Sequence, residues 1–175
     1  MNEIKITLPM DAAMAKSLKA GDAVSLSGTI YVARDAAHKR FAEALSEGRA
    51  LPFPIEGAAV YYMGPSPAKP GQVIGSAGPT TASRMDRYTP TLLDLGLRVM
   101  IGKGKRSGEV VDAMVRNGAV YLAAVGGAGA LYSKCIKSSR VVDYEELGAE
   151  ALREITVEDM KLVVAIDSAG NSVYK

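Results

Sequence analysis

Short apolar segments that end in polar, glycine-containing turns recur along the sequence and alternate with amphipathic segments. Three apolar runs have the length of buried strands: residues 58–63, 98–101 and 119–125. Two further strands are expected near the start of the chain: residues 3–8 and 23–33. Between Ser107 and Gly118, residue types preferred at the two ends of a helix, residues 108–117 have helical patterning. Because strands cluster first and alternate with helices later, the sequence predicts a mixed-sheet α/β fold, not a purely parallel doubly wound one.

The remaining elements are predicted from turn residues and from shorter patterns. Helices are expected at residues 10–18 (begun by Asp11), 36–46 (capped by Asp35 and ended by Gly48) and 145–154. Strands are expected at residues 72–77, 140–143, 162–166 and 172–174. Residues 84–95 have a helical pattern that Pro90 interrupts. The length of 175 residues suits one domain, so we expect residues 1–175 to form a single unit.

Composition excludes several classes of function. The chain is 48% apolar, but it has no Trp and only 6% aromatic residues, so its core must be mainly aliphatic. A net charge of +2 is too small to bind nucleic acid by bulk electrostatics. The longest apolar run, residues 119–125, is far shorter than a membrane span, and the first residues lack the pattern of a signal peptide. We therefore expect a cytoplasmic protein with neither a nucleic acid nor a membrane as its partner.

The chain has one cysteine, Cys135, which rules out a disulfide within the chain. One thiolate also cannot hold an iron–sulfur cluster, which usually takes three or four, so no metal ligand is predicted here. A lone cysteine is most often a small buried apolar residue. Because no histidine is near it in the sequence, we do not interpret Cys135 as a nucleophile.

Three polar turns share one arrangement, since each follows a predicted strand, contains a cation and precedes a helix. Residues 33–38 read Ala-Arg-Asp-Ala-Ala-His, residues 78–86 read Gly-Pro-Thr-Thr-Ala-Ser-Arg-Met-Asp, and residues 102–107 read Gly-Lys-Gly-Lys-Arg-Ser. Strand ends that face a common crevice are where α/β folds bind ligands, and helix N-termini there favour anions. An arginine adds a planar fork that matches a carboxylate, and a lysine adds a point charge. Together the turns predict a small site for a di-anion, with two carboxylates as its expected charged groups.

Each of these residues also has a simpler interpretation. Arg34 and Asp35 are equally explained by a surface ion pair, and Asp35 by a helix cap. The Gly-Pro-Thr-Thr segment is compatible with a purely structural turn, and Lys103 with a solvated loop lysine. His38, the only histidine, lies in the first turn of a predicted helix, where a structural hydrogen bond is more common than catalysis.

Two glycine-rich segments do not match nucleotide-binding motifs. Residues 102–107 lack the Gly-Lys-Ser/Thr ending of a phosphate-binding loop. Residues 127–132 follow a strand but lack the third glycine of the dinucleotide fingerprint. The glycines at 126–129 are better explained by tight packing or as backbone of the anion site.

The three motifs together resemble the C-terminal domain of class I fumarases, which in two-subunit enzymes is a separate beta chain. The similarity covers nearly the whole chain, and the tartrate dehydratase beta subunit is similar too. The segment Gly-Pro-Thr-Thr-x-x-Arg-Met-Asp at residues 78–86 is the more specific motif, and the Ala-Arg-Asp motif is the less specific one.

The resemblance implies a swivelling β/β/α domain and an alpha-subunit partner that holds a 4Fe–4S cluster through three cysteines. It implies that Arg34, Arg84 and Lys103 bind substrate carboxylates, together with Thr81. It also implies that Thr80 removes a proton from the substrate, and Asp35 is the competing candidate for that step.

The function expected from the resemblance is the reversible hydration of fumarate to L-malate by the beta subunit of an iron–sulfur hydro-lyase. Tartrate dehydration is the alternative within the same family. A non-catalytic module that binds a small di-anion and a stand-alone transferase or isomerase are the alternatives from other classes. The sequence leaves the oligomeric state open, and both a two-plus-two heterotetramer and a homodimer of the isolated chain are compatible with it.

Overall fold

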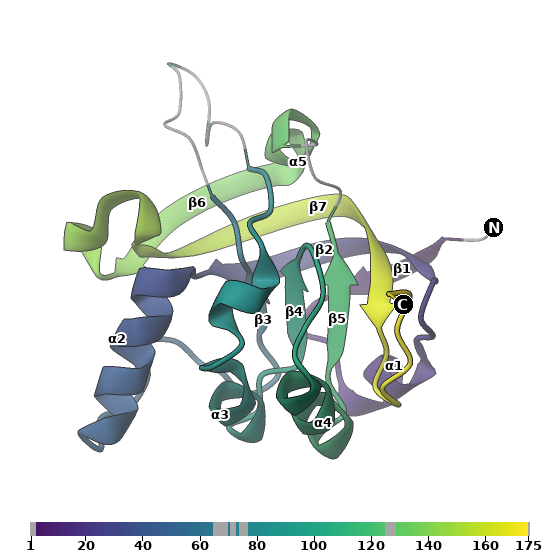
Figure 1. The fold of residues 1–175 in the computed structure, drawn as a ribbon. Helices are drawn as coiled ribbons and strands as arrows, with labels where there is room; N and C mark the ends of the chain where they lie inside the picture. The colour runs from purple at the N-terminus through teal and green to yellow at the C-terminus, as the bar shows by residue number, and fades with distance from the viewer. Residues whose placement is uncertain (1–2, 65–69, 71–72, 74–76, 125–128, 175) are drawn as a thin grey trace.

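A computed structural model describes residues 3–64, 70, 73, 77–124 and 129–174 of the chain (Figure 1). The strands are β1 (Ile4–Thr7), β2 (Ala23–Val32), β3 (Ala59–Tyr61), β4 (Val99–Gly102), β5 (Val120–Ala123), β6 (Ile136–Asp143) and β7 (Leu152–Ile166). The α-helices are α1 (Ala12–Ser17), α2 (Asp35–Ser46), α3 (Thr89–Asp94), α4 (Gly108–Asn117) and α5 (Gly129–Cys135). Two 3-10 helices complete the described elements: η1 (Ala82–Met85) and η2 (Glu145–Glu150).

The sheet is mixed, as the sequence predicted, and it closes on itself. Strands β1 to β5 pair in parallel in the order of the chain. The long strand β7 runs antiparallel to β2 along one edge and antiparallel to β5 and β6 along the other. Because β7 joins β5 back to β2, these strands form a small barrel-like sheet (Figure 1).

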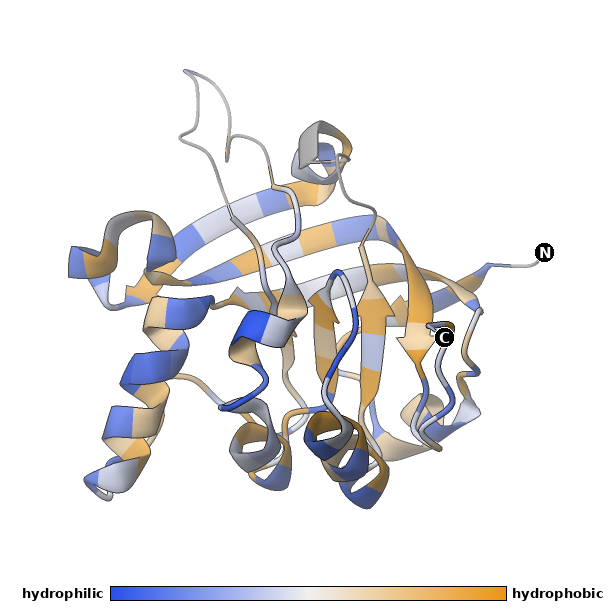
Figure 2. Ribbon diagram, in the orientation of Figure 1, coloured by the Kyte–Doolittle hydropathy of each residue, from blue (hydrophilic) through white to orange (hydrophobic). Residues whose placement is uncertain are grey.

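Two apolar clusters stabilise this arrangement. Alternate strand residues such as Tyr61 and Ile101 belong to the cluster inside the barrel, and their neighbours Tyr62 and Met100 belong to the cluster under helices α2, α3 and α4. This two-residue period is what a sheet covered on both faces requires. Figure 2 shows strong apolar colouring on β4, β5 and the C-terminal part of β7.

Local sequence signals explain the start of α1 and both ends of α4. The Asp11 carboxylate accepts a hydrogen bond of 2.7 Å from the Met14 N–H at the start of α1. The Ser107 hydroxyl accepts one of 3.3 Å from the Val110 N–H at the start of α4, and Gly118 ends that helix in the left-handed conformation. These caps confirm the predicted starts of both helices and the predicted end of α4.

Several predicted elements were wrong. Asp35 is the first residue of α2 and does not cap it; Arg34 holds the N-cap position, without a side-chain cap hydrogen bond. Residues 84–95 form parts of two separate helices, η1 and α3, and Pro90 lies in the first turn of α3, where a proline is tolerated.

The tail of the chain was also assigned incorrectly. Residues 152–166 form one strand of 15 residues, where a helix to residue 154 and a strand from residue 162 were predicted. Ser172 makes only an isolated bridge to Ile166, so the predicted strand at 172–174 is not formed. Most of the predicted strand at 72–77 lies outside the described residues. Within the described residues, none of the helices combines the length and the apolar character needed to cross a membrane.

Candidate functional site

The three predicted turns lie at the same edge of the sheet. Arg34 follows β2, Gly64 follows β3 and Lys103 follows β4, and these three strands are parallel neighbours. The carboxyl ends of parallel strands face one way, which is the location where α/β sheets bind ligands. The topology therefore brings together residues that are far apart in the sequence.

Arg34 packs against the segment that follows β3. A side-chain Cβ atom placed on Gly64 would lie 3.3 Å from a terminal nitrogen of the Arg34 guanidinium, so the absence of a side chain at Gly64 leaves room for this group. The Gly64 N–H donates a hydrogen bond of 3.1 Å to the Gly78 carbonyl. Gly64 therefore contacts both the first polar turn (residues 33–38), through Arg34, and the start of the Gly-Pro-Thr-Thr segment, through Gly78.

Arg84 forms an ion pair with Asp35 at 2.7 Å, which links the second turn to the first residue of α2. The Arg84 side chain is 54% exposed and that of Asp35 31% exposed, so the pair contributes only about 0–1 kcal/mol to folding. The ion pair that the sequence suggested between Arg34 and Asp35 is thus formed by Asp35 with another arginine. A pair this weakly held can release Arg84 to a ligand.

The two threonines lie beside the third polar turn, residues 102–107, which is called the lysine turn below. The Thr80 N–H donates a hydrogen bond of 2.8 Å to the Tyr62 carbonyl, and Thr81 pairs with Lys103 as an isolated parallel bridge. The Ala82 N–H donates one of 2.9 Å to the Lys103 carbonyl. Residues 80–82 therefore extend the edge at which β3 and β4 end.

Gly102 allows this close approach. A Cβ atom at Gly102 would lie 2.8 Å from the Tyr62 ring, 3.2 Å from the Ala82 Cβ and 3.6 Å from the Thr80 carbonyl oxygen. The first distance is too short for a real contact. A glycine is therefore required at this position for residues 78–86, called the threonine turn below, to lie against the end of β4.

The residues brought together carry an excess of positive charge. Arg34, Arg84 and Lys103 supply three cations, whereas Asp35 and Glu150 supply two carboxylates; that of Glu150 accepts a hydrogen bond of 3.2 Å from the Ala36 N–H. Lys103 is exposed, and it makes no ion pair within the described part of the chain. The cations outnumber the carboxylates, which favours an anionic ligand; that this ligand is a di-anion stays a prediction from the sequence.

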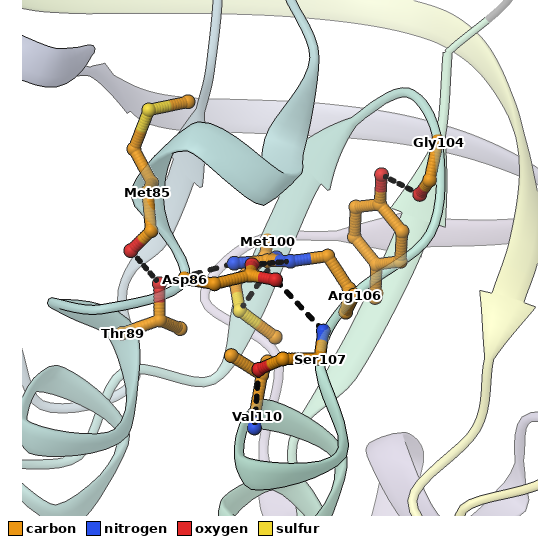
Figure 3. Close-up of polar contacts among 9 residues, drawn as sticks. Met85, Asp86, Thr89, Met100, Gly104, Arg106, Ser107 and Val110 are labelled. Atoms are coloured by element: carbon orange, nitrogen blue, oxygen red, sulfur yellow. Dashed lines mark hydrogen bonds and ion pairs between the residues drawn. The ribbon is translucent and has the colours of Figure 1, made fainter.

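Sequence reasoning missed a buried ion pair that joins the second and third turns (Figure 3). The Arg106 side chain is 0% exposed, and its Nε donates to the Asp86 carboxylate at 2.7 Å. The other oxygen of Asp86 accepts from the Ser107 N–H at 2.7 Å, and a terminal nitrogen of Arg106 donates to the Thr89 hydroxyl at 3.0 Å. Arg106 and Asp86 were visible in the motifs, but nothing in the sequence identified them as partners.

His38 is buried and makes a structural hydrogen bond. Its Nδ1 lies 2.8 Å from the Arg34 carbonyl, which can only accept, so this nitrogen carries the hydrogen. Its Nε2 is buried and has no hydrogen-bond partner among the residues that the structure describes. Burial lowers the pKa of His38 to about 4, although the hydrogen bond to the Arg34 carbonyl opposes this shift. The imidazole is therefore neutral at physiological pH and supports the backbone at Arg34.

Other candidates for chemistry lie elsewhere or are not described. Cys135 is partly buried at the end of α5, and burial raises the pKa of its thiol, which disfavours the thiolate. No group of three or more His, Cys, Asp or Glu side chains among the described residues is arranged to hold a metal. Most of the glycine turn at 126–129 lies outside the described residues. A cavity of about 200 Å³ beside the start of β3, against Leu8 and Ala59, contains none of the candidate site residues.

Comparisons with known proteins identify relatives along the whole chain. A family model described as "Fumarase C-terminus" matches residues 1–175. "Fumarate hydratase class I, aerobic" from Escherichia coli (strain K12) is 42% identical over 154 residues, which are 87% of this chain. "Fumarate hydratase 2" from Leishmania major is 39% identical over 156 residues, which are 88% of this chain.

The relatives differ in how much of their own length is matched. The chain spans only 28% of each of these two fumarate hydratases. "Putative L(+)-tartrate dehydratase subunit beta" from Methanocaldococcus jannaschii is 39% identical over 166 residues, which are 91% of this chain and 85% of that protein.

Proposed function

The chain belongs to the Fumarase C-terminus family, and on that premise we propose that it supplies part of the active site of a carbon–oxygen hydro-lyase acting on a four-carbon dicarboxylate. The observation that supports this most strongly is the meeting of the three cation-bearing turns at the ends of β2, β3 and β4. Within the described residues, the three cations Arg34, Arg84 and Lys103 lie at one end of the sheet together with two carboxylates, those of Asp35 and Glu150.

The cations would bind the substrate carboxylates. Arg34 and Arg84 present planar forks that bind carboxylates through two parallel hydrogen bonds. Lys103 adds a point charge. Thr81, whose backbone forms a bridge with that of Lys103, adds a hydroxyl as a hydrogen-bonding group. For Arg84 to bind substrate it must exchange its contact with Asp35 for one with a substrate carboxylate. Because this ion pair is exposed, breaking it costs little free energy.

Thr80 would remove the proton beside a carboxylate in the dehydration direction. Negative charge then builds up on that carboxylate, where each well-placed cationic donor contributes about 3 kcal/mol of stabilisation. A threonine hydroxyl is a weak base, and cations beside it favour its deprotonated form. Asp35 is the competing base, because its carboxylate is released when Arg84 exchanges the 2.7 Å contact with it for a substrate carboxylate. We assign proton removal to Thr80, and the matched variants described below decide between the two residues.

The cluster implied by the family does not fit this chain. Three thiolates are needed, and the chain has a single cysteine, at the end of α5. We therefore propose that an alpha subunit holds the 4Fe–4S cluster and that the present chain closes over the substrate. The name of the Methanocaldococcus jannaschii relative, which describes a beta subunit, supports a partner of this kind.

We propose fumarate hydration as the reaction and tartrate dehydration as the second candidate. The second candidate is supported by one relative, 39% identical over 166 residues, which is named a putative L(+)-tartrate dehydratase subunit beta. Malate and tartrate differ by one hydroxyl and carry the same two carboxylates, so the same cations could bind both.

The proposed function is tested by mixing the purified chain with an iron–sulfur alpha subunit under anaerobic conditions. Fumarate absorbance is followed with malate as substrate, and oxaloacetate formation is followed with tartrate. Turnover of either substrate supports the proposal and identifies the reaction. Binding of dicarboxylates without any turnover would support a non-catalytic module instead.

Matched variants test the assigned base. Thr80→Val keeps the shape and removes the hydroxyl, so kcat should fall by about 10²-fold or more. Thr80→Ser keeps the hydroxyl and should retain most of the activity. Asp35→Asn should lower kcat by less than about 10-fold, and a larger loss there than in Thr80→Val would transfer the role of base to Asp35.

A further inference from the structure

We propose that Asp86 and Arg106 are positioning residues, which hold the threonine turn and the lysine turn in register for the reaction. The inference rests on the proposed function, because it assigns these two turns to one active site. Neither residue is placed to touch the substrate, since the Arg106 side chain is fully buried and that of Asp86 is 13% exposed.

The pair joins the two segments that carry the reacting groups. Asp86 directly follows η1, so it ends the turn that begins with Thr80 and Thr81. Arg106 comes three residues after Lys103, and the Ser107 N–H also donates to Asp86. One carboxylate therefore binds two successive residues of the lysine turn, through its two separate oxygens.

Arg106 is itself fixed from several sides. Its guanidinium lies 5.1 Å from the ring centre of Tyr62 and 5.0 Å from that of Tyr121, within the range of cation–π attraction. It also donates to the hydroxyl of Thr89, which in turn donates 2.8 Å to the Met85 carbonyl of η1 (Figure 3). The guanidinium thus has little freedom to follow a shifted Asp86.

A second contact fixes the lysine turn at Gly104. The Tyr121 hydroxyl donates a hydrogen bond of 2.9 Å to the Gly104 carbonyl, directly after Lys103. Gly104 has the left-handed backbone conformation that favours glycine. The turn after Lys103 is therefore held by Tyr121 at Gly104 and by Asp86 at Arg106 and Ser107.

A buried ion pair is weak evidence for a role in stability. Replacing both partners with apolar or neutral groups of similar size is often neutral or stabilising, whereas removing one partner is costly. Here the pair supplies a defined geometry between the two turns, which an apolar contact would not. The hydrogen bond from the Ala82 N–H to the Lys103 carbonyl, at 2.9 Å, crosses the same junction and reports on it.

The first experiment is amide hydrogen exchange on the isolated chain, which does not depend on any partner or activity. In Asp86→Asn, protection of the Ala82 amide should fall by at least about 10-fold relative to that of the Gly21 amide. The Gly21 N–H donates to the Val164 carbonyl at 2.8 Å in the barrel, so it reports on overall stability. Unchanged relative protection at Ala82 would overturn the proposal.

The second experiment separates positioning from stability. The double variant Asp86→Asn with Arg106→Met should recover the unfolding stability lost in Asp86→Asn, yet both should have a kcat at least about 10-fold below the wild type in the assembled enzyme. A kcat that recovers together with stability would show a merely structural role. The control is Asp94→Asn, because Asp94 likewise accepts from an arginine, Arg116, and from a second donor, but is exposed and remote from the site.

The exchange experiment and the activity experiment distinguish failure of the proposed function from failure of the positioning role. If the assembled wild-type enzyme turns over no hydroxy-dicarboxylate, the proposed function fails while the exchange result still decides the coupling of the two turns. If turnover is normal in Asp86→Asn although exchange at Ala82 increases, the turns are coupled but their register does not limit the reaction, and the positioning role is refuted.

Discussion

His38 should make the stability of the chain depend on pH in a way that one substitution removes. It is the only histidine in the sequence, and the folded chain buries it completely. Burial lowers its pKa from 6.5 to about 4, so below pH 6.5 the unfolded chain takes up a proton that the folded chain does not. The contribution of His38 to stability is therefore complete above pH 6.5 and is lost progressively as the pH falls towards 4.

The size of the effect follows from the two pKa values. Linkage between protonation and folding gives a loss of about 2 kcal/mol between pH 7 and pH 5, and about 3 kcal/mol once the pH is below 4. The range from pH 7 to pH 5 is the more informative one, because most carboxylates titrate below it.

The assay is urea unfolding of the wild type and of His38→Asn at pH 7, 6 and 5. The asparagine amide can replace the Nδ1 hydrogen bond to the Arg34 carbonyl, but it does not titrate. The difference in unfolding free energy between the two proteins should shift by about 2 kcal/mol in favour of the variant from pH 7 to pH 5. A difference that does not change with pH would refute the conclusion that His38 is buried and neutral.

Three further substitutions test the site and its supports. Arg84→Lys should lower kcat/KM of the assembled enzyme by more than about 10-fold because an ammonium cannot replace the two-pronged carboxylate contact, whereas Arg116→Lys, at a similarly exposed arginine, should have no effect. Gly102→Ala should cost about 1–3 kcal/mol in urea unfolding, since the added Cβ would lie 2.8 Å from the Tyr62 ring, and an unchanged unfolding midpoint would contradict this packing. Ser107→Ala should cost about 1 kcal/mol in thermal unfolding through loss of the α4 cap, and a cost near zero would mean that the cap contributes nothing.

The meeting of the three turns could be predicted from the sequence because the rule behind it is topological. Parallel strands separated by helices place their carboxyl ends at one edge, whatever the details of packing. Arg34 and Lys103 each come just after a strand of that kind, and Thr80 hydrogen-bonds to Tyr62 at the end of another. Their proximity could therefore be predicted without any knowledge of distances. The roles of these side chains remain predictions.

The partner of Asp35 could not be predicted in the same way. The sequence suggested Arg34 because it is adjacent, but neighbouring residues at the start of a helix do not face one another. The actual partner, Arg84, is brought to Asp35 by the path of the chain after β3, which no local pattern encodes. The burial of Arg106 is of the same kind, because arginine is rarely buried and only the folded chain shows Asp86 beside it.

The long strand β7 shows where local propensity misleads. Its first half contains charged residues that favour helices, and the sequence therefore predicted a helix reaching residue 154. In the folded chain this half pairs with β2 on one side and β6 on the other. Pairing between distant segments outweighs the weak preference of single residues, so strand propensity depends on neighbours that the sequence does not display.

The most direct test of the account is a crystal structure of the chain assembled with its alpha subunit and a bound hydroxy-dicarboxylate. The account predicts Arg34, Arg84 and Lys103 within hydrogen-bond distance of the ligand carboxylates, and the Thr80 hydroxyl facing the carbon that loses its proton. A ligand whose carboxylates are held by other residues, with these turns left in solvent, would contradict it.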